Sequence, residues 1–126
     1  MLYQLPPNLK AEPPLLRDFL HQLPRDLQAA FEFRHASWFN DDTYAALRDA
    51  GAALCVAESE ELATPAVRTA PFAYLRLRRL DYDAAALSKW ADFAQASPGD
   101  VFVYFKHEDE ARGPAFAKRF LPLLQR

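Results

Sequence analysis

Ionisable side chains end an otherwise apolar segment at residues 31–38, where Phe-Glu-Phe-Arg-His is followed by Ala-Ser-Trp. The side chains of a strand alternate between its two faces, so Glu32 and Arg34 share one face while the neighbouring phenylalanines point the other way. If helices cover the phenylalanines, the charged pair faces the opposite interior, where unpaired charge is costly and is usually balanced or functional. This strand end is therefore the first candidate for chemistry.

Further polar side chains stand at the ends of other apolar segments, at Gln4, Glu58, Arg76 and Lys106. Adjacent strands lie about 4.8 Å apart, so Glu32 and Glu58 at equal heights would form a carboxylate pair with one raised pKa, giving an acid and a base. In this hydrolase or lyase interpretation, Gln4, Arg34, Arg76 and Lys106 bind the anionic group of a ligand. The same charges also fit a salt-bridge network that only holds the strand ends together, and both interpretations stay open.

His35 and Trp38, which follow Arg34 in the chain, each have two possible roles. His35 has the chemistry of a general base, or it caps the end of its strand. Trp38 offers a ring for stacking on a ligand, or it plugs the loop beside Phe39. The spacing of the potential ligands does not support a metal site, so we expect none.

The composition is that of a globular chain, with 126 residues, 51% of them hydrophobic, 25% charged, and a net charge of −2. We expect a single domain over residues 1–126. The near-neutral charge argues against a nucleic-acid partner. No apolar run is long enough to cross a bilayer and no basic leader opens the chain, so we expect a cytoplasmic protein without a membrane partner. The single cysteine, Cys55, lies in an apolar run and is expected to be a core residue.

Short apolar runs alternate with segments of helical period along the chain. Strands are predicted at residues 2–5, 28–33, 53–57, 72–77 and 101–105. Helices are predicted between Pro13 and Leu23, from the Asn40 region to Gly51, from Asp83 towards residue 98, and from Pro114 onwards. Strands separated by helices favour a parallel sheet covered by helices.

Two architectures fit this repeat: a complete five-stranded doubly wound sheet, and part of an eight-stranded (β/α) TIM barrel. The polar strand positions favour the barrel. An open doubly wound sheet has helices on both faces, whereas a barrel has an interior whose upper layer can be polar around a ligand. Arg76, with Leu77 still to follow in its strand, is hard to place on a helix-covered face.

Five short motifs follow one another along nearly the whole chain: Gln4-Leu5-Pro6-Pro7, Glu32-Phe33-Arg34-His35-x-Ser37-Trp38, Ala57-Glu58-Ser59 with Thr64-Pro65 behind it, Tyr74-Leu75-Arg76-Leu77, and Val103-Tyr104-Phe105. As a set, the motifs resemble the landmarks of the DUF72 proteins, also called the YecE-like or UPF0759 family. The resemblance implies a TIM-barrel fold and a biochemical activity that is not established. It also implies that the chain begins at the family's fourth strand and lacks the family's first half.

The chain departs from the family pattern at two places. It has Arg76-Leu77-Arg78-Arg79 where many members carry Arg-x-His-Gly, and Lys106-His107-Glu108-Asp109 where many carry an Asn-Asn-Asp-like run. A site that depended on those amide side chains or on that glycine would be altered. The polar strand ends are nevertheless kept at both places, where positively charged side chains replace the neutral donors of the family pattern.

These observations predict a DUF72-like part-barrel of unknown activity, with a small anionic ligand or substrate at the C-terminal ends of its strands. The sequence names no cofactor and no reaction. The alternative is a truncated, non-catalytic fragment or interaction module, because five strands leave two unpaired edges and an open inner face. Such a chain would associate with a missing N-terminal half or form a homo-oligomer.

Overall fold

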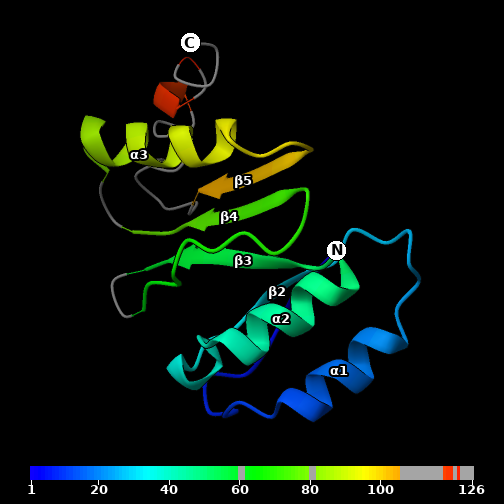
Figure 1. The fold of residues 1–126 in the computed structure, drawn as a ribbon. Helices are drawn as coiled ribbons and strands as arrows, with labels where there is room; N and C mark the ends of the chain where they lie inside the picture. Colours follow the sequence, from blue (N-terminus) through cyan, green and yellow to red (C-terminus); the bar gives the residue numbers. More distant parts are fainter. Residues whose placement is uncertain (60–61, 80–81, 106–117, 121, 123–126) are drawn as a thin grey trace.

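Five parallel strands form one sheet in the computed structural model, which describes residues 1–59, 62–79, 82–105, 118–120 and 122 (Figure 1). The strands are β1 (Leu2–Gln4), β2 (Ala30–Glu32), β3 (Ala53–Glu58), β4 (Ala73–Leu77) and β5 (Val101–Phe105). The helices are α1 (Pro13–His21), α2 (Asp41–Ala50) and α3 (Ala84–Gln95), with a short 3-10 helix η1 (Ala36–Trp38). All five predicted strands are confirmed. The start of the helix predicted from Pro114 lies outside the described residues.

Local signals set the ends of the helices. The side chain of Asn40 accepts a hydrogen bond from the backbone N–H of Thr43 at 2.9 Å and caps the start of α2. Gly51 ends α2 in the left-handed conformation, with φ of +67°, which glycine adopts without a steric penalty. Asp83 caps α3 in the same way as Asn40 caps α2, at 2.8 Å from the N–H of Ala86. Within the described residues, no helix has the length and apolar character needed to cross a membrane.

The strand order in the sheet is the order in the chain, β1-β2-β3-β4-β5, and all four neighbouring pairs are parallel. A doubly wound sheet reverses its strand order at a switch point, and this sheet has no reversal. Right-handed crossovers in an unreversed order place every connecting helix on the same face. The alternative of a complete doubly wound sheet is therefore wrong, and the order is that of a barrel wall.

The sheet also curls as a barrel wall does. Gln28, just before β2, donates a hydrogen bond from Nε2 to Oδ2 of Asp100, just before β5, at 3.4 Å. Three strand spacings separate β2 from β5, so a flat sheet would hold these backbones about 14 Å apart, too far for the two side chains to meet. The two edge strands likewise line one common hollow, through Gln4 of β1 and Tyr104 of β5. The fold is therefore part of an α/β barrel.

The outer face of the sheet is covered by helices and forms most of the core. Phe31 and Leu54 pack with helices α1 and α2 in one cluster, and Leu75 packs with α3 in another. The buried side chains that α1, α2 and α3 contribute to these two clusters are Leu16, Leu20, Tyr44, Ala46, Leu47, Leu87, Trp90, Ala91 and Ala94. These contacts fix which strand positions face outwards and, by alternation, which face inwards.

The inner face carries the intervening strand positions. Its lower part is apolar, where Ala30, Ala53, Cys55 and Phe72 form a buried cluster that contains no helical residue from the described part of the chain. Cys55 is fully buried there, which confirms its expected place in the core. Within the strands themselves, the charged side chains of this face lie towards the C-terminal ends, as in the layered interior expected of a barrel.

Candidate functional site

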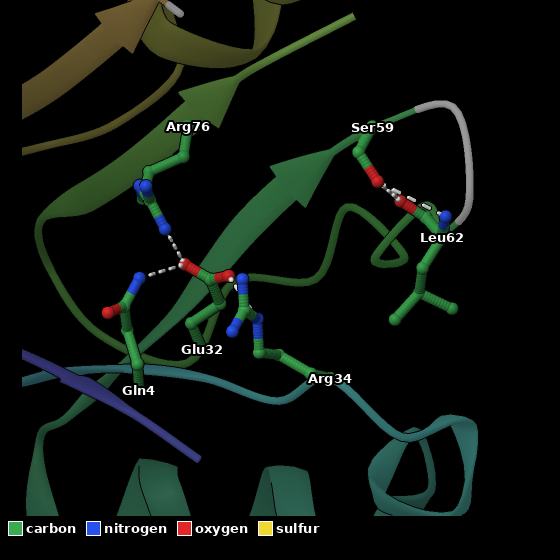
Figure 2. A network of polar contacts seen from close by, with 6 residues as sticks. All are labelled: Gln4, Glu32, Arg34, Ser59, Leu62 and Arg76. Atoms are coloured by element: carbon green, nitrogen blue, oxygen red, sulfur yellow. Dashed lines mark hydrogen bonds and ion pairs between the residues drawn. The ribbon is translucent and has the colours of Figure 1, made fainter. Parts of the chain in front are cut away.

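Four polar side chains meet on the inner face near the C-terminal ends of the strands, and we call them the Glu32 cluster: Gln4, Glu32, Arg34 and Arg76 (Figure 2). Glu32 lies at the centre and is only 4% exposed. Its Oε1 accepts hydrogen bonds from Gln4 Nε2 at 3.4 Å and from Arg76 Nη1, and its Oε2 lies 3.5 Å from Arg34 Nε. The structure thus brings four of the candidate site residues together on one face of the sheet.

The strand register explains this meeting. Gln4 lies directly opposite Glu32 in the β1–β2 pair. Strand β3 separates β2 from β4, and its inner-face residues at this height are Cys55 and Ala57, which are both small. These small side chains leave room above β3, so the guanidinium of Arg76 reaches across one strand to the carboxylate of Glu32.

A hollow of about 490 Å³ lies beside the cluster on the inner face. It is lined by Leu2, Gln4, Tyr74, Arg76, Arg78, Tyr104 and Phe105. Among these lining residues there is no acid. Arg78 continues the inward phase of Arg76 and lines the hollow, while Arg34 and Arg76 contact the carboxylate of Glu32. These four charged residues therefore carry an excess of two positive charges.

The electrostatics of the inner face keep its thiol inert. Burial raises the pKa of Cys55, the negative charge of Glu32 raises it further, and the charge of Arg76 opposes this in part. A buried thiol with a raised pKa stays protonated at neutral pH and is a poor nucleophile. Burial also raises the pKa of Tyr74, whose phenol neighbours Tyr104.

Glu58 lies on the other face of the sheet, so the expected carboxylate pair with Glu32 is wrong. It is in phase with Leu54 and Val56, which both belong to the helix-covered clusters. Burial raises the pKa of Tyr82, and the charge and hydrogen bond of Glu58 raise that pKa further. Among the described residues, Oε1 of Glu58 is buried without a hydrogen-bond partner. Glu58 thus contributes to the outer core around Tyr82.

The structure does not bring His35 or Trp38 into the hollow. His35 caps η1, because its Nδ1 accepts a hydrogen bond from the N–H of Ser37 at 3.1 Å. Trp38 is buried against Phe33, with ring centroids 4.7 Å apart, and its Nε1 donates to the carbonyl of Leu9 at 2.9 Å. Both side chains therefore have structural contacts. Lys106 lies outside the described residues.

Five residues that line the hollow were not predicted as part of the site: Leu2, Tyr74, Arg78, Tyr104 and Phe105. The signal was present, because Tyr74 and Arg78 share the strand phase of Arg76, and Arg76 lies opposite Tyr104 in the β4–β5 pair. Within the described ranges, no group of three or more His, Cys, Asp or Glu side chains is placed to hold a metal ion.

A curled parallel sheet with outer helices and a polar inner layer at the C-terminal strand ends defines a partial α/β barrel, the class whose ligand sites lie at that end. The model of the family "Protein of unknown function DUF72" matches residues 1–126, and the chain belongs to this family. The resemblance inferred from the motifs is therefore confirmed.

Solved structures of family members agree with this assignment. A DUF72 family protein from Thermotoga maritima has a TM-score of 0.84 at 21% identity, covering 99% of this chain and 57% of that one. A DUF72 family protein from Enterococcus faecalis has a TM-score of 0.78 at 14% identity, covering 100% of this chain and 61% of that one. At these identities the likeness shows the fold, and the chain spans about three fifths of each structure. No curated protein matches the chain.

Proposed function

We propose that this protein binds a small anionic ligand or substrate in the inner-face hollow, at the C-terminal ends of its strands. The observation that carries the proposal is the excess of guanidinium groups around the single carboxylate of the Glu32 cluster, beside a hollow of about 490 Å³. That volume lies within the range of about 300–1,000 Å³ typical of small-molecule sites. In α/β barrels this end of the strands is where ligands bind.

In the proposed site, one residue positions an arginine and other arginines bind the ligand. Glu32 holds Arg76, whose side chain is 19% exposed and lines the hollow. Arg78 and the 42% exposed side chain of Arg34 supply the positive charge that Glu32 does not balance. Arginine forks bind carboxylate or phosphate oxygens in pairs, which suits them to a small anion. With Glu58 on the other face, the site supports anion recognition rather than a mechanism based on that carboxylate pair.

Titration of the chain with inorganic phosphate, followed by amide chemical shifts in NMR spectra, tests this function. We expect saturable shifts at the C-terminal ends of β1, β2 and β4. Arg78→Gln should weaken phosphate binding about tenfold, because it removes a charge-assisted hydrogen-bond donor. Arg25→Gln is the matched control: Arg25 is exposed and lines a different hollow, between α1 and α2, so phosphate affinity should be unchanged. Equal losses in the two variants, or shifts that never saturate, would contradict an anion site.

A second observation indicates that the chain also associates with a partner that completes the barrel. Within the described ranges no strand pairs with the outer edges of β1 and β5, and an apolar groove of about 340 Å³ runs along β1 and α1. Leu15 and Phe19 of α1 are 52% and 38% exposed at this groove. We infer that the N-terminal βα units of the family complete an eight-stranded barrel against this edge.

A second copy of the chain is the competing occupant of this edge, and sedimentation equilibrium distinguishes the two. The 126-residue chain should not form a stable dimer, since two five-stranded walls cannot close an eight-stranded barrel. A stable dimer that Phe19→Asp disrupts would assign the edge to a homo-oligomer. The cytoplasmic location and the lack of nucleic-acid and membrane partners stay predictions.

A further inference from the structure

We infer that the ligand of the inner-face hollow carries a flat ring next to its anionic group. This inference rests on the proposed anion site and names the class of molecule that would fill it. It follows from the aromatic side chains of β4 and β5, which the anion-binding role alone does not use.

Three aromatic rings contact one another in series along the inner face. The ring centroids of Tyr74 and Phe102 lie 5.8 Å apart with an interplanar angle of 29°, and those of Tyr74 and Tyr104 lie 5.4 Å apart at 30°. Phe102 belongs to the apolar lower part of the face, whereas Tyr74 and Tyr104 line the hollow. Tyr104 ends the series and is 51% exposed. The inner face thus presents a large aromatic surface at the height where the charged groups begin.

The strand register places this aromatic surface next to the guanidinium groups. Arg76 and Tyr104 are direct partners in the β4–β5 pair, so their Cβ atoms lie about 5 Å apart on the same face. Arg78 follows Arg76 in the same phase and lines the same hollow. A ring stacked on Tyr104 would therefore hold an anionic substituent within reach of both arginines.

The size and chemistry of the hollow favour a ring over a bare anion. Its volume of about 490 Å³ is far more than a single phosphate or carboxylate group fills. A bare anion would satisfy the arginines but leave the ring of Tyr104 in water. A flat ring would bury that aromatic surface, and it would gain from stacking with the tyrosine and from contact with the guanidinium planes. An aliphatic group of similar size would gain less, because it lacks a π face.

A comparison of two carboxylates tests the inference by isothermal titration calorimetry on the 126-residue chain. Benzoate and cyclohexanecarboxylate have the same charge and similar size, but only benzoate is flat and aromatic. We expect benzoate to bind about five- to tenfold more tightly. Tyr104→Leu should abolish this preference, whereas Tyr104→Phe keeps a ring and should retain it. Thermal melting followed by circular dichroism checks that each variant is folded.

The outcomes separate this inference from the proposed function. If phosphate binds and the two carboxylates bind equally, the ring is refuted and the anion site stands. If neither phosphate nor benzoate binds, both proposals fail. Should Tyr104→Leu not fold, the comparison of benzoate with cyclohexanecarboxylate on the unaltered chain still decides the matter, because it needs no variant.

Discussion

Glu32 and Glu58 lie near the ends of adjacent strands, yet their surroundings differ completely. Glu32 faces inwards and meets three donor side chains, from Gln4, Arg34 and Arg76. Glu58 faces the helix-covered side, where it neighbours the phenol of Tyr82 and one of its oxygens has no partner among the described residues. The comparison shows that the face of the strand, rather than the position along it, decides what a carboxylate can do.

The sequence left two interpretations of these charges open, a salt-bridge network and a ligand site, and the surroundings of Glu32 are compatible with both. A carboxylate as buried as Glu32 is stable only when it is paired, and its contacts with Arg76 and Gln4 satisfy this requirement. These contacts form the salt-bridge network. Arg34 also contacts Glu32, so the cluster holds more positive charge than one carboxylate neutralises; in the proposed anion site this charge, with that of Arg78, would meet the ligand. The same cluster can therefore be structural in its pairing and functional in its excess charge.

The largest expected effect comes from separating Glu32 and Arg76. Glu32→Gln should lower the free energy of unfolding by about 3 kcal/mol, because it leaves Arg76 without a counter-charge in a mostly buried site. Arg76→Gln should lower it by less, because Arg34 still contacts the carboxylate of Glu32. The double variant should cost about 2 kcal/mol less than the sum of the single costs, since it removes both charges. Urea unfolding followed by the fluorescence of the buried tryptophans measures these values. Simple additivity would contradict direct pairing.

A smaller effect on the free energy of unfolding should come from the ionisation of Cys55, which lies on the inner face beside Glu32. Because the native thiol has a raised pKa, the folded chain keeps its proton above pH 8.5, where the unfolded chain releases it. The native state then binds more protons than the unfolded state, so the free energy of unfolding should fall by up to about 1.4 kcal/mol per pH unit. Below pH 8.5 this contribution is fully present.

Cys55→Ala removes the titrating thiol, so the free energy of unfolding of this variant should fall less steeply with pH than that of the unaltered chain. Urea unfolding of both proteins at pH 8, 9 and 10, under reducing conditions, gives the difference directly. Other groups that titrate in this range, such as the tyrosines, affect both proteins and cancel in the comparison. Parallel stability curves would show that the thiol is not shielded by the inner face.

The sequence predicted the strands and the shared face of Glu32 and Arg34 because apolar and polar residues alternate clearly in this segment, and β4 alternates in the same way around Arg76. Strand β3 alternates large and small apolar residues, and Glu58 shares the phase of the large ones, Leu54 and Val56. What the sequence did not show is that this phase faces the helices. That assignment depends on packing between distant segments, which the pattern of one strand does not contain.

Residues outside the strands were harder to interpret for a similar reason. The structural role of Trp38 comes from the carbonyl of Leu9, which lies far away in the chain. The strand order that excludes a doubly wound sheet is likewise a property of the assembled sheet, because βα repeats of this length fit both arrangements.

The smallest expected effect lies at Glu58, on the outer side of the comparison. Glu58→Gln should change the free energy of unfolding by about 1 kcal/mol or less, because the amide oxygen can still accept a hydrogen bond from the phenol of Tyr82 and no charged partner is lost among the described residues. Phosphate affinity should not change, since this side chain lies on the face away from the hollow. Urea unfolding and the phosphate titration used for Arg78→Gln measure both quantities. A loss of phosphate affinity equal to that of Arg78→Gln would return Glu58 to the site and refute the division of the two carboxylates between the faces of the sheet.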